Sequence, residues 1–483
     1  MTKNAVSALE VPLKTWSKTS LFVVLLSNLS IGIGVVYFAN NVEYPLLWLL
    51  VFVLFIVALT PIFIELRKGK FDLFNLKNAF VGYYLTQFGV WTVWVLINGP
   101  IHNPYVPFVV AVQYKPWIVA LSYALIGLIF FYLGYYMRLG YLFSTKLFYF
   151  SSRIKALNFY VAELALIFAA LLSVILLVKT SAGLIYFVTH IDEFRTTSLL
   201  GKGYLYYGIS LLSIAYLIFS IYTILKHRCQ IFNYIFLLII VSISLLVGFR
   251  YMTMYTLTYF VITRHYLYKR IRIKQVVAFM LLFIPLNIFY PIFRGYAHLG
   301  IKNMFSTITI DFSLFYNMFL SRFHGVESLV RIINTIPTVG FQYGKYFLLD
   351  IVSFPVPRVL WPGKPISSGL RQNMLFWGDI FHKGDIGAAV PTFIGELYWI
   401  AGIVGIIVGM FLMGIFLRMM YSYMINHISG ASVAIYAVSF WFAMFVNETL
   451  SLHTITFVST IIPLVFIFLF VNSFRLKRAR KIT

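Results

Sequence analysis

The sequence contains about twelve apolar runs, separated by short polar tracts. Each run is long enough to cross a bilayer as a helix, which takes roughly 20 apolar residues. A helix also satisfies every backbone polar group internally, as lipid requires. The sequence therefore predicts an all-α polytopic integral membrane protein with about 12 transmembrane helices. The runs cover approximately 21–38, 44–64, 79–98, 117–137, 158–178, 204–225, 232–249, 251–268, 275–292, 396–417, 431–447 and 455–474.

The distribution of positive charge along the chain reflects its predicted membrane topology. The formal net charge is +24, but Lys and Arg cluster in tracts that follow the even-numbered runs and end the chain. Such an asymmetry is typical of cytoplasmic connections, so both termini are predicted to be cytoplasmic. This placement argues against nucleic acid as a partner. The single cysteine, Cys229, forms no internal disulfide, and no Cys/His spacing resembles a metal site, so no metal or cofactor is expected.

One connection, residues 293–395, is far longer than an ordinary loop, and loops of this length are usually functional or disordered. We predict a single membrane domain, 1–483, with 293–395 as a large periplasmic loop that contains amphipathic helices. The loop is basic on the side where basic residues are rare. An anionic ligand such as a diphosphate explains this, because Arg binds phosphate through two parallel hydrogen bonds. Lipid headgroups or internal salt bridges remain the alternative.

Residues 311–333 have the apolar periodicity of an amphipathic helix. His324, Glu327 and Arg331 fall on its polar face, whereas Arg322 projects within the apolar arc. A charge in an apolar arc is costly unless it is paired. Two interpretations of Arg322 stay open, namely snorkelling to a lipid headgroup and contact with a substrate phosphate.

Three further charged residues lie at the ends of apolar runs. Arg250 stands between two runs and Arg294 at the end of another, where each is either a functional residue or part of a turn. Glu396 begins the tenth run, where a carboxylate can act as a general base or stabilise a helix N-terminus.

Residues 354–371 read FPVPRVLWPGKPISSGLR, and their prolines bar a helix. Arg358 and Lys364 are thereby placed on a stiff, extended segment beside Trp361. An aromatic ring next to basic groups suits sugar stacking and phosphate contact. A rigid structural loop is the alternative interpretation.

The stretch Pro357-Arg358-Val359-Leu360-Trp361-Pro362-Gly363-Lys364-Pro365 resembles the P-R-x-x-W-P-x-K-P signature of Wzy-type O-antigen polymerases. Gly395-Glu396-Leu397-Tyr398, followed by Gly402 and Gly405, is similar to that family's G-E-x-Y…G…G stretch. By layout the resemblance covers most of the chain, and by motif it covers only the neighbourhood of 250 and 354–405.

The resemblance implies a fold similar to C-type lipid-dependent glycosyltransferases in the bacterial inner membrane. The implied activity is a metal-independent glycosyltransferase that polymerises undecaprenyl-diphosphate-linked repeat units for lipopolysaccharide or another surface polysaccharide. A chain-length regulator is an implied partner, beside the lipid bilayer. For this chemistry we assign the diphosphate to Arg250, Arg294, Arg322, Arg358 and Lys364, and sugar stacking to Trp361. Proton transfer is assigned to His324, Glu396 or Glu327. An O-antigen ligase and a lipid-linked oligosaccharide flippase remain the rival functions.

Overall fold

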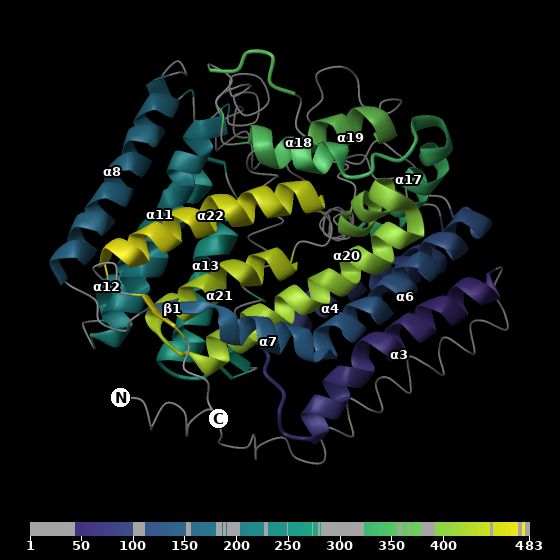
Figure 1. Ribbon diagram of the computed structural model, residues 1–483, viewed down its shortest axis with the longest axis horizontal. Helices are drawn as coiled ribbons and strands as arrows, with labels where there is room; N and C mark the ends of the chain where they lie inside the picture. The colour runs from purple at the N-terminus through teal and green to yellow at the C-terminus, as the bar shows by residue number, and fades with distance from the viewer. Residues whose placement is uncertain are drawn as a thin grey trace, which may run out of the picture.

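The computed structural model is a bundle of helices (Figure 1). It describes residues 44–99, 112–150, 156–179, 203–226, 230–248, 250–272, 274–278, 323–354, 360–365, 368–377, 392–444, 448–471 and 476–478, and the single residues 186, 190, 281 and 356.

The chain up to residue 267 supplies α3 (Pro45–Arg67), α4 (Leu76–Leu85), the π-helix η1 (Thr86–Val90), α5 (Trp91–Asn98), α6 (Tyr114–Tyr136), α7 (Arg138–Lys146), β1 (Phe148–Phe150), α8 (Ala156–Lys179), α11 (Gly203–Leu225), α12 (Gln230–Leu246) and α13 (Arg250–Leu267). The second half supplies α17 (Gly325–Val339), α18 (Lys345–Ser353), α19 (Ser368–Trp377), α20 (Phe393–Asn426), α21 (Gly430–Met444), α22 (Leu450–Val471) and β2 (Leu476–Arg478).

Seven helical stretches of the described residues are long and apolar enough to cross a membrane. They are Pro45–Arg67, Leu76–Asn98, Tyr114–Tyr136, Leu157–Lys179, Tyr207–Leu225, Phe393–Asn426 and Leu450–Val471. The protein is thus an all-α membrane protein, and the short β1–β2 ladder is the one departure within the described ranges.

These seven stretches coincide with seven of the predicted spans. Three more predicted spans are helical as α12, α13 and α21, but they are shorter or less apolar than the seven. The predicted run 21–38 lies outside the described residues, and so does most of 275–292.

Helices α6 and α20 cross with their backbones in close contact. A Cβ on Gly134 would overlap the carbonyl oxygen of Phe411, and one on Gly414 would overlap that of Phe131. Small residues permit this approach, and they are typical of helix contacts in membranes, where helices gain little from burying apolar surface. At the edge of the bundle, α8 leaves Leu164 and Phe168 about two-thirds exposed, as suits a lipid-facing side.

The bundle has two distinct ends (Figure 1). Helices α17, α18 and α19 lie together at one of them, which we call the α17–α19 end. Helix α7 and strand β1 lie at the opposite one, the α7 end. There β1 pairs antiparallel with β2, with Phe148 opposite Arg478 and Phe150 opposite Leu476. The described parts of the predicted loop 293–395 therefore gather on one side of the membrane helices.

Candidate functional site

A π-helical turn interrupts the second membrane stretch where it meets α17. This turn, η1, carries Gln87, whose side chain is completely buried. A Cβ on Gly325 would lie 2.9 Å from the carbonyl oxygen of Gln87, so only a residue without a side chain allows this contact. Single π-helical turns are frequent at functional sites. The contact brings the first turn of α17 directly onto a membrane helix.

Glu327 occupies that first turn. The indole Nε1 of Trp91, in α5, donates a hydrogen bond to Oε1 of Glu327. Oε2 is buried and accepts no hydrogen bond from the described residues. Part of the side chain remains exposed, but Oε2 is covered. Burial raises the pKa of Glu327 to about 8, although its own backbone N–H and the indole of Trp91 act to lower the pKa. The carboxyl therefore mostly keeps its proton at pH 7 and changes charge just above it.

His324 directly precedes α17 as its N-cap residue, with φ −110° and ψ 32°. Residues 323 and 324 are not helical, so the predicted continuous helix over 311–333 is wrong at this point. The helix begins instead at Gly325, where contact with Gln87 fixes the entry of the chain. His324 therefore lies outside the helix whose polar face it was predicted to share with Glu327. Residues 311–322 lie outside the described part of the chain.

Glu396 belongs to a short helical segment that folds back on the rest of α20. The helix breaks at Ala401 and Gly402, and Gly402 has φ 62° and ψ −145°, a conformation that side chains disfavour. A Cβ on Gly405 would overlap the carbonyl oxygen of Leu397, so the two arms of α20 touch. The predicted run 396–417 is thus helical on both sides of a break and is not one straight helix.

The break in α20 frees backbone carbonyls, and the chain before α18 uses them. The backbone N–H groups of Gln342 and Tyr343 donate to the carbonyl oxygens of Trp399 and Ile400, respectively, each at an N···O distance of 3.0 Å. Buried backbone groups need such partners. The segment between α17 and α18 is therefore fastened to the folded-back arm of α20.

The carboxylate of Glu396 is completely buried and caps a neighbouring helix. The backbone N–H of Ser451, in the first turn of α22, donates to Oε2 over 3.0 Å, and the Ser451 hydroxyl donates to Oε1. Asp350 of α18 and Gln372 of α19, both buried, lie close enough to interact with it. Glu396 thus joins α18, α19, α20 and α22 at the α17–α19 end.

Of the five predicted diphosphate ligands, the structure describes the side chain of Lys364 alone. Arg294, Arg322 and Arg358 lie outside the described residues, and of Arg250 only the backbone is described, at the start of α13. The ammonium group of Lys364 donates to the carbonyl oxygens of Phe354, at 3.3 Å, and Val356, at 3.0 Å.

Lys364 therefore ties the proline-rich segment to the end of α18. No helix forms over the described residues 360–365, as the prolines predict. Trp361 keeps 37% of its surface exposed and is accessible to a sugar.

Sequence reasoning missed five residues that build this region, namely Gln87, Trp91, Asp350, Gln372 and Ser451. Asp350 carried a readable signal, because it is an isolated acid in the apolar stretch Phe347–Val352. The other four are ordinary residues in helices, and only the tertiary contacts reveal them. Arg331, predicted on a polar helix face, donates through Nε to the carbonyl oxygen of Phe376 in α19.

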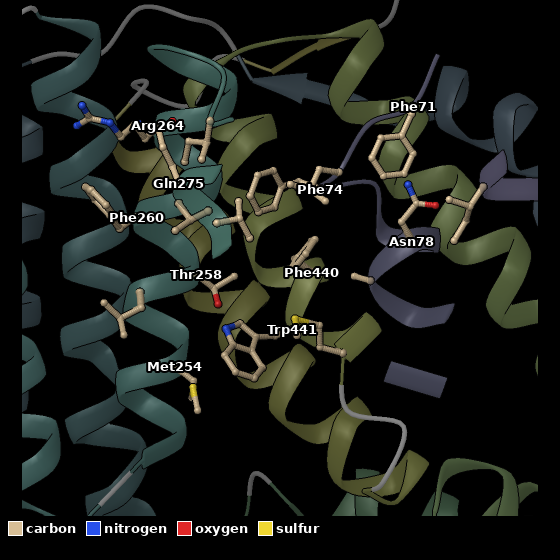
Figure 2. Close-up of a pocket in the computed structure, with 18 of the residues that line it drawn as sticks. Phe71, Phe74, Asn78, Met254, Thr258, Phe260, Arg264, Gln275, Phe440 and Trp441 are labelled. Carbon is tan, nitrogen blue, oxygen red and sulfur yellow. The ribbon is translucent and has the colours of Figure 1, made fainter. Parts of the chain in front are cut away.

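A large cavity lies elsewhere. It has a volume of about 570 Å³ and opens between α13, α21 and the segment that leads into α4 (Figure 2). Its wall is mainly aromatic and aliphatic, with Phe74, Phe260, Phe440 and Trp441 around it. No carboxylate is part of its described lining. This cavity therefore offers no described carboxylate for proton transfer, and we place the candidate site at Glu327 instead.

Comparison with known proteins gives one match. A family model described as a domain of unknown function, DUF8712, matches residues 201–446, just over half of the 483-residue chain. The matched region runs from α11 to the end of α21 and includes Glu327 and Glu396. No curated protein and no solved structure matches the chain.

Proposed function

We propose that this protein, which belongs to the DUF8712 family, polymerises oligosaccharide repeat units carried on undecaprenyl diphosphate. The observation that carries the proposal is Glu327, a covered carboxyl with an unengaged oxygen beside the membrane helices. A titratable group held near neutral pKa by burial is suited to general acid–base catalysis. The sequence resemblance supplies the substrate class.

In the proposed reaction, a sugar hydroxyl of the incoming repeat unit attacks the anomeric carbon of the growing chain. The bond from that carbon to the carrier diphosphate breaks, and the diphosphate leaves with the bonding electrons. Glu327 takes the proton of the attacking hydroxyl, and Trp91 orients the carboxylate through Oε1. The unengaged Oε2 is the oxygen that accepts the proton.

The leaving diphosphate gains negative charge as the bond breaks, and positioned cations stabilise that charge. We assign this role to Arg250, Arg294, Arg322 and Arg358, with His324 beside the base. Glu396 is assigned a positioning role, because both of its oxygens already accept hydrogen bonds from Ser451.

The proposal also includes a membrane topology. Twelve spans place both termini in the cytoplasm and the α17–α19 end in the periplasm, in a bacterial inner membrane. The basic residues Arg67, Lys68, Arg138 and Lys146 support this orientation, because they lie at the ends of α3 and α7 that belong to the α7 end. Positive residues concentrate on the cytoplasmic side of membrane proteins.

The proposal is tested by deleting the gene in a strain that displays a repeat-unit glycan. We expect glycans that carry a single repeat unit, because assembly and export continue while chain extension stops. Loss of every repeat unit would overturn the proposal in favour of a ligase or a flippase. The site is tested by complementation with Glu327→Gln, which should also give single repeats. Asn334→Ala, an exposed change on the same helix, serves as the matched control and should restore long chains.

A further inference from the structure

Helix α18 has its polar and apolar faces reversed. Asp350 and Ser353 point into the protein and are each only 3% exposed. On the other face, Leu348 is 60% exposed and Val352 is 69% exposed. A helix on a water-facing surface shows the opposite arrangement, with its apolar side chains toward the core.

The exposure of these two residues is close to that of side chains on a membrane helix. Leu164 and Phe168 on α8 are 67% and 70% exposed, and α8 is apolar enough to cross a membrane. The apolar surface also extends beyond α18, since Leu360 is 77% exposed and Tyr343 is 79% exposed. Monomeric proteins in water rarely leave such a continuous apolar surface uncovered.

The surroundings of α18 place it at the level of the membrane helices. It packs against α22, which is one of the seven membrane stretches. Phe354, the residue after α18, meets the ring of Tyr207 in α11 edge-on, with centroids 4.9 Å apart. Lys345 begins the helix on its exposed side, where a long side chain can reach lipid headgroups. Helix α18 and the residue after it therefore pack directly against two of the membrane stretches.

We propose that α18 lies within the bilayer interface at the α17–α19 end, with Leu348 and Val352 in contact with lipid acyl chains. The occupant of this surface is the lipid of the adjoining leaflet. Asp350, on the inner face, then lies beside Glu396, so a single helix separates lipid from a buried acidic cluster. The inference rests on the polarity and position of α18, and it holds whether or not the protein is a polymerase.

Fluorescence quenching tests the depth of α18 in the full-length protein. Cys229 is first replaced by serine, and a single cysteine is introduced at Leu348, then labelled with a small environment-sensitive fluorophore. The protein is reconstituted in phosphatidylcholine–phosphatidylglycerol vesicles. Quenching by acyl-chain nitroxide lipids is compared with quenching by aqueous iodide. Leu164→Cys on α8 is the lipid reference, and Thr338→Cys, an exposed polar position on α17, is the reference outside the acyl region.

We expect the Leu348 label to behave like the Leu164 label, with nitroxide quenching about threefold stronger than iodide quenching. The Val352 label should give the same result. Labels at both positions that are quenched by iodide as strongly as the Thr338 label would overturn the proposal. This test measures only the depth of α18 in the bilayer. A negative result would overturn the proposal for α18 and leave the polymerase proposal standing, because the gene deletion tests that proposal separately.

Discussion

The two ends of the helical bundle differ in the partners of their buried charged side chains. At the α7 end, Lys77 forms a 2.8 Å ion pair with Glu65, and Asp72 accepts hydrogen bonds from the hydroxyls of Tyr266 and Tyr421. At the α17–α19 end, Glu327 has one indole donor and no basic partner within the described residues. Buried charges that only hold a structure together are normally paired. The contrast agrees with a stabilising role for the charges at the α7 end and with the proposed role of Glu327 in proton transfer.

The largest expected effect is on Glu327. Glu327→Gln keeps the shape of the side chain and its contact with Trp91 but removes proton transfer. We expect the initial rate of chain extension in reconstituted vesicles to fall about a thousandfold, within the range of general-base removal. The thermal midpoint of the variant should match that of the wild type. Chain extension at the wild-type rate would contradict this contrast, because the buried charged groups at both ends of the bundle would then have only a structural role.

Lys77→Met tests the other side of the comparison. It leaves Glu65 partly buried and unpaired, since the Lys77 side chain is fully buried and that of Glu65 is 20% exposed. The expected loss is about 3 kcal/mol of unfolding free energy, measured in mixed detergent micelles. The double variant Lys77→Met/Glu65→Leu should regain most of that loss. Equal losses in the single and double variants would show that the ion pair is not the cause.

Ser451→Ala asks whether Glu396 belongs with the structural charges. The change removes the hydroxyl donor and leaves the carboxylate with the backbone N–H of the same residue. We expect a loss of about 2 kcal/mol of unfolding free energy, because a buried carboxylate loses a hydrogen bond. Ser451→Thr, which retains a hydroxyl, is the matched control. A large rate defect at unchanged stability would place Glu396 among the catalytic groups instead.

The pH dependence of chain extension follows from Glu327. Its pKa is raised to about 8, so the basic form grows as pH rises through that value. The ionised fraction rises about tenfold from pH 6 to pH 7 and levels off above pH 8, and kcat/KM should follow it. The rate should thus be lost toward acid pH. A flat profile between pH 6 and pH 9 in the wild type would exclude Glu327 as the base.

Lys364→Met should have the smallest effect. The ammonium group of Lys364 binds two backbone carbonyls, so its removal should cost about 1 kcal/mol of unfolding free energy. We expect KM for the lipid-linked substrate to stay within about twofold of the wild-type value. A rise of tenfold or more would return Lys364 to the diphosphate ligands that the sequence predicted.

The membrane helices were predictable because each apolar run carries its own signal. The seven long stretches match predicted runs to within a few residues at most ends. The starts and breaks inside helices were not predictable in the same way. Gly325 begins α17 because Gln87 lies against it, and these two residues are far apart in the sequence. Gly402 was part of a recognised motif, but its left-handed backbone appears only in the folded chain.

The candidate site was predictable in part. Glu327 and His324 were predicted on the polar face of an amphipathic helix and Glu396 at the start of an apolar run, and all three lie at the α17–α19 end of the bundle. Their partners Trp91 and Ser451 carried no signal, because a tryptophan or serine in a membrane helix is ordinary. The sequence pattern did not predict on which face of α18 Asp350 lies. In the structure Asp350 is buried, so the polar face of α18 points into the protein.

The β1–β2 ladder has a consequence for the biogenesis of the protein. Strand β1 precedes most of the membrane helices, whereas β2 follows the last of them, about 330 residues later. During synthesis β1 is made early, whereas its partner β2 is made only after α22. Pairing of these two strands therefore requires that the whole chain between them has been synthesised. A ribosome that stops before β2 leaves an open strand edge, the kind of surface that invites aggregation.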